Sequence, residues 1–134
     1  MNYWLVKTEP ETYSWDDLAR DKKTVWDGVR NFQARNNLKS MKKGDTVFIY
    51  HSGDDKAVLG TAKILKEAYP DPKDKDWIVV EIVADKKLKR PVTLSQVKAT
   101  KKLSNMVLVK SSRLSIQPVR EDEFNAVLEL SELK

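Results

Sequence analysis

The residue types best suited to chemistry stand together in one short segment, Trp26–Asn31, which reads WDGVRN. Trp26 offers a large flat surface, and Gly28 lets the backbone turn or approach a ligand closely. The amide of Asn31 can donate and accept hydrogen bonds, which suits the edge of a nucleobase, and it can equally cap a following helix. Arg30 can contact a phosphate or stack on a base. The segment therefore fits a base-binding platform, and it also fits a packed turn with a buried tryptophan.

A helix is expected directly after this segment, over residues 31–41. Its apolar stripe at helical spacing consists of Ala34, Leu38 and Met41. The basic stripe beside it consists of Arg35, Lys39 and Lys42. Proteins that bind single strands or individual bases join aromatic platforms to basic grooves in this way.

No catalytic machinery is recognisable in the sequence. The chain has one histidine, no cysteine and four isolated glycines, which leaves no thiol, no paired-histidine metal site and no glycine-rich phosphate loop. The lone histidine, His51, lies in Tyr50–Ser52, three hydrogen-bonding side chains at the end of a strand. It fits a surface or packed turn residue as well as a donor at the rim of a pocket. We expect no enzyme activity, no metal and no cofactor.

Length and composition indicate one domain that spans residues 1–134. Hydrophobic residues make up 40% of the chain and charged residues 34%, a balance typical of a globular protein. The net charge of +5 favours polyanionic partners, although a solvated, lysine-rich surface has the same charge. The apolar runs are strand-sized and no signal peptide is recognisable, so we expect an intracellular protein without a membrane partner. That location is the cytoplasm in a prokaryote, with the nucleus open in a eukaryote.

Hydrophobic patterning predicts five or six strands with short helices between them, a mixed α/β domain of the α+β type. Strands are expected at residues 2–7, 45–51, 57–67, 77–84 and 105–110. In the strand at 45–51, Val47 and Ile49 are expected on one face and Thr46, Phe48 and Tyr50 on the other. Residues 69–74 are expected to form a loop, and Gly60 indicates a bulge or a close backbone approach. Sheets of this kind often close into a barrel that removes exposed edges.

Helices are expected at residues 15–20, after a capping box at Ser14 and Asp17, and at 31–41. The spacing of Thr93 and Gln96 suits the cap of another short helix, and residues 113–118 lead into a last helix around Phe124, Val127 and Leu128.

Five short motifs, taken in order, resemble the EVE domain family. They are YWLVKTEP at 3–10, WDGVRN with QARN at 26–36, YHS at 50–52, AYPD at 68–71 and RLSIQP at 113–118. The resemblance covers the chain nearly end to end. It implies a PUA-like fold, which is a barrel-like mixed sheet with helices around it, and a relationship to YTH and other readers of modified bases.

The resemblance also implies a site that receives a flipped base, such as a methylated cytosine of DNA or RNA. The residues expected around the base are Thr8, Trp26, Asn31, Tyr50, His51 and Ser52, with residues 7–10 as one wall. The residues expected toward the nucleic-acid backbone are Lys7, Arg30, Arg35 and Lys39. Two further candidates, Arg113 and Ser115, belong either to the site or to packing. The protein is expected to be a monomer.

Three features depart from the family pattern, and one of them, Arg120 where relatives often have a threonine helix cap, is expected to affect stability only. Position 8 is threonine where many relatives have serine, which keeps the hydroxyl and narrows the site slightly. The segment between Asp71 and Trp77 is short, which is expected to leave the pocket more open. Three functions stay open at this point: a reader of modified bases, a general RNA-binding module, and a small-molecule sensor or enzyme that uses the same pocket.

Overall fold

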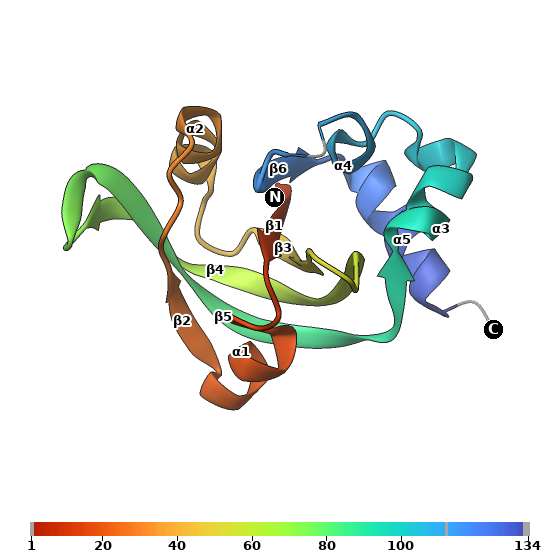
Figure 1. Cartoon of the computed structure of the whole chain (residues 1–134), viewed down its shortest axis with the longest axis horizontal. Helices are drawn as coiled ribbons and strands as arrows, with labels where there is room; N and C mark the ends of the chain where they lie inside the picture. Colours follow the sequence, from red (N-terminus) through yellow and green to blue (C-terminus); the bar gives the residue numbers. More distant parts are fainter. Residues whose placement is uncertain (1, 112, 133–134) are drawn as a thin grey trace.

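The computed structural model describes residues 2–111 and 113–132, which form a mixed sheet with helices on both faces (Figure 1). The six strands have the order β2-β5-β4-β3-β1-β6, which is an open sheet with β2 and β6 at its edges. The strands are β1 (Tyr3–Thr8), β2 (Lys23–Trp26), β3 (Thr46–His51), β4 (Ala57–Asp71), β5 (Asp74–Thr93) and β6 (Ile116–Val119). The helices are α1 (Trp15–Asp21), α2 (Phe32–Ser40), α3 (Leu94–Ala99), the 3-10 turn η1 (Lys101–Leu103), α4 (Val107–Lys110) and α5 (Glu121–Glu132). The predicted mixed α/β class is confirmed.

Each face of the sheet has its own hydrophobic core, because side chains alternate along a strand. In β3, Val47 and Ile49 face the core that α1 and α2 cover, whereas Phe48 and Tyr50 face the core that α3, α4 and α5 cover. Figure 1 shows α3, α4 and α5 grouped at the right, with α2 at the upper left and α1 at the bottom. The alternation predicted for residues 46–50 is thus confirmed, and the cavity described below opens on the α1/α2 side.

Capping side chains begin three of the helices, as their sequences predict. Ser14 accepts a hydrogen bond from the Asp17 N–H at 3.0 Å, and the Asp17 carboxylate accepts one from the Ser14 N–H at 2.9 Å. A second capping box joins Thr93 to Gln96 at the start of α3. Asn31 accepts from the Ala34 N–H at 2.9 Å and begins α2. These bonds satisfy backbone donors that have no partner inside the helix.

The loop predicted at 69–74 is wrong, because β4 and β5 form one long hairpin that turns at residues 72–73. The Asp71 carboxylate accepts the Lys73 N–H at 2.9 Å and closes this turn. Pro70 is tolerated inside the strand because the pairing of β4 with β3 ends at Lys63, so the outer part of β4 pairs with β5 alone.

The strand predicted at 105–110 is also wrong, because this apolar stretch forms α4 and packs against the core under α5. Met106 and Leu108 are buried there, and a short buried helix has the same composition as a buried strand. Two strands were not predicted. One is β2, which follows α1, and the other is β6, which begins at Ile116 in the segment that was expected only to lead into the last helix.

Gly60 lies where β4 crosses the indole of Trp15, and both features predicted for it are present. The pairing of β4 shifts register between Val58 and Gly60. A Cβ at position 60 would lie 2.7 Å from two carbons of the Trp15 ring and 2.9 Å from the carbonyl oxygen of Lys86. The absence of a side chain therefore lets α1 approach the sheet.

We expect Gly60→Ala to destabilise the domain by about 1–3 kcal/mol, the range for overpacking a tight interior. The added methyl group meets an indole and a backbone oxygen, and neither can move without shifting α1 or the sheet. Denaturant unfolding measures the change. The cost should shrink in a Trp15→Leu background, whose smaller side chain frees space, and a Gly60→Ala variant as stable as the parent chain would contradict the contact.

Candidate functional site

A cavity of about 520 Å³ opens where β1 and β2 end, on the face of the sheet that α1 and α2 cover. Its lining comes from four segments, residues 7–9, 12–13, 24–30 and 115–116. This volume lies within the range of ordinary small-ligand pockets, and it is large enough for a nucleobase with part of its sugar.

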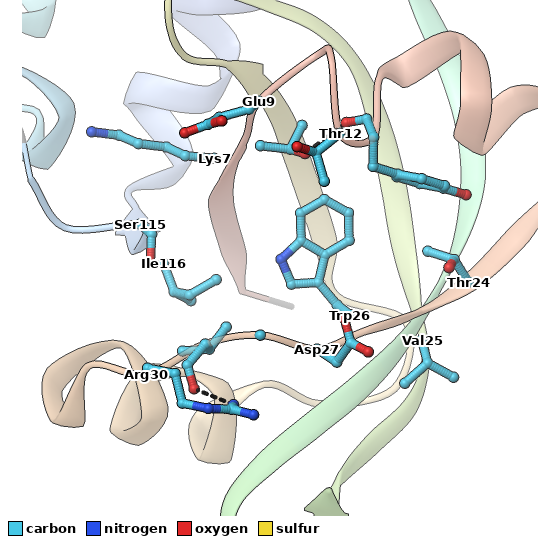
Figure 2. Close-up of a pocket in the computed structure, with 14 residues that line it drawn as sticks. Lys7, Glu9, Thr12, Thr24, Val25, Trp26, Asp27, Arg30, Ser115 and Ile116 are labelled. Carbon is cyan, nitrogen blue, oxygen red and sulfur yellow. Dashed lines mark hydrogen bonds between the residues drawn. The ribbon is translucent and has the colours of Figure 1, made fainter. Parts of the chain in front are cut away.

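Trp26 is the central aromatic surface of the cavity. Figure 2 shows its indole between the segment that carries Lys7 and Glu9 and the segment that leads to Arg30. The side chain is 8% exposed, so one part packs in the core and another part lines the cavity. Trp26 is the last residue of β2, where it pairs with Val80 of β5. The backbone turns directly after it at Gly28, which has a φ of +79°.

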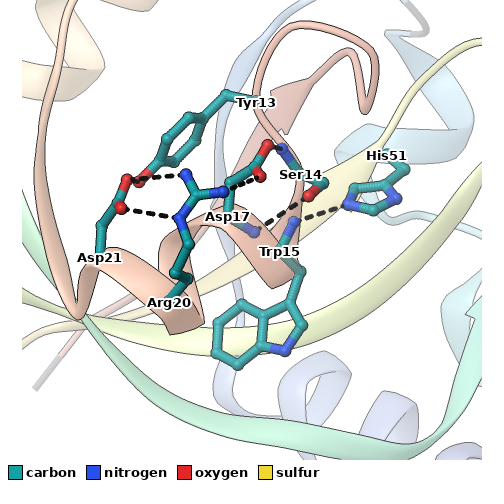
Figure 3. A network of polar contacts seen from close by, with 7 residues as sticks. All are labelled: Tyr13, Ser14, Trp15, Asp17, Arg20, Asp21 and His51. Atoms are coloured by element: carbon teal, nitrogen blue, oxygen red, sulfur yellow. Dashed lines mark hydrogen bonds and ion pairs between the residues drawn. The ribbon is translucent and has the colours of Figure 1, made fainter.

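Tyr13 supports the edge of Trp26, and a polar network holds Tyr13 (Figure 3). The two rings meet edge to face, with centroids 6.3 Å apart. The Tyr13 hydroxyl donates to Asp21 at 2.9 Å, and Asp21 also accepts from Arg20. Burial, and then the hydrogen bond to Asp21, raise the pKa of Tyr13, so its hydroxyl stays protonated and keeps donating. The ion pairs of Arg20 are solvent-exposed and contribute little stability, and one of them holds the Asp21 carboxylate that accepts from Tyr13.

Thr8 and Ser52 fix the turn that forms the opposite wall. The Thr8 hydroxyl donates to the carbonyl of Tyr13 at 2.6 Å, and the Thr8 carbonyl accepts from the Ser52 N–H at 2.9 Å. The Ser52 hydroxyl also donates to the Thr8 carbonyl, at 3.3 Å. The threonine hydroxyl is therefore used within the wall, where it shapes the cavity.

Charged side chains of both signs stand around the cavity. Figure 2 shows the Lys7 ammonium pointing away from Trp26, and its Nζ lies 5.7 Å from the centre of the Tyr50 ring. Partial burial lowers the pKa of Lys7. Arg30 donates to the carbonyl of Val29 at 3.0 Å and contacts Asp71 at 3.5 Å. Its side chain is 44% exposed, so the guanidinium remains open to an anion.

Five of the predicted site residues line the cavity and seven do not. The five are Lys7, Thr8, Trp26, Arg30 and Ser115. The seven are Asn31, Arg35, Lys39, Tyr50, His51, Ser52 and Arg113. Asn31 caps α2 with its side-chain oxygen, and Tyr50 points into the core on the other face of the sheet. Lys39 and Arg113 are exposed, and Arg35 binds the carbonyl of Asp76 on the hairpin.

His51 lies outside the cavity and supports its wall by binding the backbone at the start of α1. Its Nε2 accepts the Trp15 N–H at 2.9 Å, and its Nδ1 lies 3.1 Å from a carboxylate oxygen of Asp55. An Nε2 that accepts leaves the proton on Nδ1, which can then donate to Asp55. His51 and Ser52 thus hold the two ends of the wall segment that runs from Thr8 to Trp15.

Several lining residues were missed by sequence reasoning, and Tyr13 is the most important of them. It directly precedes the helix cap Ser14, a position where an apolar residue often fixes how the chain enters a helix, and this signal was present in the sequence. Thr24 and Val25 were missed because β2 was not predicted.

A mixed open sheet with a separate core on each face and an aromatic cavity at the ends of β1 and β2 is a PUA-like domain. The chain belongs to the EVE domain family, whose family model matches residues 2–130. Thymocyte nuclear protein 1 of Homo sapiens is 38% identical over 98% of this chain and 74% of that protein. That alignment spans 167 positions against 134 residues here, so the human protein carries inserted residues relative to this chain.

Solved structures show the same fold. A crystal structure of a protein from Agrobacterium tumefaciens superposes with a TM-score of 0.94 at 43% identity, over 99% of this chain and 94% of that one. Human thymocyte nuclear protein 1 in complex with DNA that contains 5-methylcytosine superposes with a TM-score of 0.93 at 35% identity, over 100% of this chain and 99% of that one. An ASCH protein from Zymomonas mobilis, 13% identical with a TM-score of 0.60, shares the fold alone.

The described residues include neither a membrane-spanning helix nor a cluster of metal ligands. None of their helices is both long and apolar enough to span a membrane. No group of three or more histidine, aspartate or glutamate side chains among them is arranged to hold a metal ion.

We expect His51→Ala to destabilise the domain by about 1–3 kcal/mol, because the buried Trp15 N–H loses its acceptor. Asp55→Ala is the matched control. It removes the exposed partner on the other ring nitrogen and should cost less than about 1 kcal/mol. Denaturant unfolding of both variants measures the difference. Equal costs would contradict a supporting role that runs through Trp15.

Proposed function

We propose that this chain binds nucleic acid and takes a modified base, such as 5-methylcytosine of DNA, into the cavity around Trp26. The observation that carries the proposal is the indole of Trp26 lining a base-sized cavity, in a chain whose fold superposes closely on that of a relative in complex with 5-methylcytosine DNA. That relative binds its DNA through the same type of domain, so DNA is the first candidate partner here.

The chemistry of the cavity suits a base. The Trp26 indole supplies a face for stacking, while the hydroxyls of Ser115 and Thr24 stand in the lining as donors and acceptors for the base edge. Extruding a base from a duplex costs a few kcal/mol, and stacking on an aromatic ring returns about 1–3 kcal/mol. Capture therefore needs the edge hydrogen bonds as well, and through them the site can discriminate one base from another.

Cations extend from the cavity along α2. Arg30 lies at the cavity, and Arg35 and Lys39 follow it along α2. Acidic side chains at the rim, Glu9 and Asp27, limit unspecific attraction to phosphate. The alternative is a general RNA-binding module without preference for a modified base, which the same basic helix face would serve.

We expect Trp26→Phe to weaken binding of a 5-methylcytosine oligonucleotide and to reduce its advantage over the unmethylated strand, because the smaller ring leaves part of the base face uncovered. Fluorescence anisotropy with matched methylated and unmethylated DNA and RNA measures both effects. Thermal unfolding of the variant checks that the core around position 26 is intact. Equal affinity of the parent chain for methylated and unmethylated strands would refute base reading and favour the general RNA-binding alternative.

We expect Lys39→Ala to make the logarithm of the binding constant less steep against the logarithm of salt concentration, by roughly 0.7–0.9 for one lost phosphate contact. The methyl preference should stay unchanged, because phosphate contacts carry no base information. Lys98→Ala removes the same exposed charge from α3, on the other face of the sheet, and should leave the slope as it is. Equal effects of the two variants would exclude α2 as the phosphate-facing surface.

A further inference from the structure

Phe32, the first residue of α2, holds its ring outside the cavity and 65% exposed to solvent. Among the described residues, the one other large hydrophobic side chain with comparable exposure is Val25, which lines the cavity. Phe32 stacks on Trp77 of β5, with ring centroids 5.2 Å apart and planes inclined by 27°. One face of Phe32 is therefore covered by a second aromatic ring, while much of the remaining ring surface meets water.

Two guanidinium groups flank this aromatic pair. Arg35 lies 5.0 Å from the centre of the Phe32 ring and 5.6 Å from that of Trp77, and Arg30 lies 5.5 Å from Trp77. Residues of the β4–β5 hairpin hold both arginines in place. Arg35 donates to the carbonyl of Asp76 at 2.8 Å, and Arg30 contacts the carboxylate of Asp71. Cations held over aromatic faces in this way are stabilised by the ring electrons. The result is a flat apolar surface with positive charge beside it.

The surface is continuous with the cavity through Arg30, which lines the cavity and also lies over Trp77. A strand whose modified base occupies the cavity thus meets Arg30 at its backbone and Phe32 at its neighbouring base. Stacked aromatic rings with flanking arginines suit a nucleobase and its phosphate, since every base has a face that stacks. A single exposed phenylalanine is common on protein surfaces and needs no explanation. Phe32 differs because Trp77 supports one face of its ring and two arginines lie beside the pair, one of which also lines the cavity.

We propose that Phe32 and Trp77, with Arg30 and Arg35 beside them, form a stacking platform for the base next to the one held in the cavity. The proposal rests on the proposed function and deepens it, because it names the substrate class. A neighbour that stays paired after the modified base is extruded is still held in the duplex by its base pair and its remaining stack, so it cannot swing out onto Phe32. The preferred ligand is therefore a strand in which the modified base and one neighbour are both unpaired, as in single-stranded DNA or at a mismatch.

The test uses the full chain and single-stranded DNA oligonucleotides with one 5-methylcytosine. The fluorescent base 2-aminopurine is placed next to the methylated base, on the 5′ side in one set and on the 3′ side in another. Phe32→Leu removes the aromatic face and keeps an apolar side chain, Phe32→Tyr restores the aromatic face, and Trp26→Phe alters the cavity while leaving the Phe32–Trp77 pair in place. Thermal unfolding checks that the variants are folded: Phe32→Tyr should match the parent chain, and Phe32→Leu should lose at most a few degrees of melting temperature with the Trp77 stack.

In the parent chain and in Phe32→Tyr, we expect binding to quench 2-aminopurine on one of the two sides. In Phe32→Leu the quenching should be lost and affinity should fall about tenfold, the size of one lost base–aromatic stack. The ratio of affinities for methylated and unmethylated strands should stay the same in that variant, and it should change in Trp26→Phe.

The outcomes separate the platform from the cavity. If the parent chain prefers methylated strands while Phe32→Leu binds them equally well without a change in quenching, the platform is refuted and the base cavity stands. Equal affinity for a fully paired duplex and a duplex mismatched beside the modified base would also overturn the platform. If the parent chain binds none of the oligonucleotides, both proposals fall.

Discussion

The parallel pairing of β1 with β3 is the constraint on which the cavity depends. Parallel strands end at the same edge of a sheet, so Thr8 lies opposite His51 where both strands stop. From that edge Ser52 holds the Thr8 carbonyl and His51 holds the first N–H of α1. The chain between these two anchors forms one wall of the cavity, and the side chains of Thr8, His51 and Ser52 hold it through hydrogen bonds to the main chain. A substitution that removes one of these bonds therefore changes the course of the wall as well as its chemistry.

The segment Trp26–Asn31 combines the two interpretations that its sequence left open. Asn31 caps a helix and Gly28 makes the turn, so these two residues belong to the packed-turn interpretation. Trp26 and Arg30 line the cavity, as the binding interpretation requires. Trp26 and Arg30 are held firmly because the turn at Gly28 and the helix cap at Asn31 fix the backbone beside them. Rigid placement lowers the entropy lost when a ligand is bound.

Local signals predicted the parts of the fold that depend on near neighbours. The capping boxes at Ser14 and Thr93 and the alternation along β3 rest on residues a few positions apart, and all of them were found. The strand β2, the strand β6 and the long hairpin depend on pairing with distant segments, and residues 106–108 are apolar whether they form a strand or a helix. Sequence pattern carries little information on such choices.

The candidate site shows the same division. Thr8 and Trp26 were found because motifs carry them. Tyr50 was wrongly expected at the pocket, although it was correctly predicted to share a face with Phe48. Alternation along a strand shows which residues share a face, but it does not show which face bears the cavity. Tyr13 reaches the cavity only through the way α1 is docked against His51 and Gly60.

The strand order has a consequence for how the domain folds. β1 is the first strand in the chain, yet it lies between β3 and β6, so one of its edges stays unpaired until Ile116–Val119 are in place. Contacts that join such distant segments slow folding and leave a sheet edge open meanwhile. Ser115 and Ile116 also complete the lining of the cavity. During synthesis the lining of the cavity is therefore complete only after the last strand has been made, and until then the unfinished chain has an open sheet edge at β1.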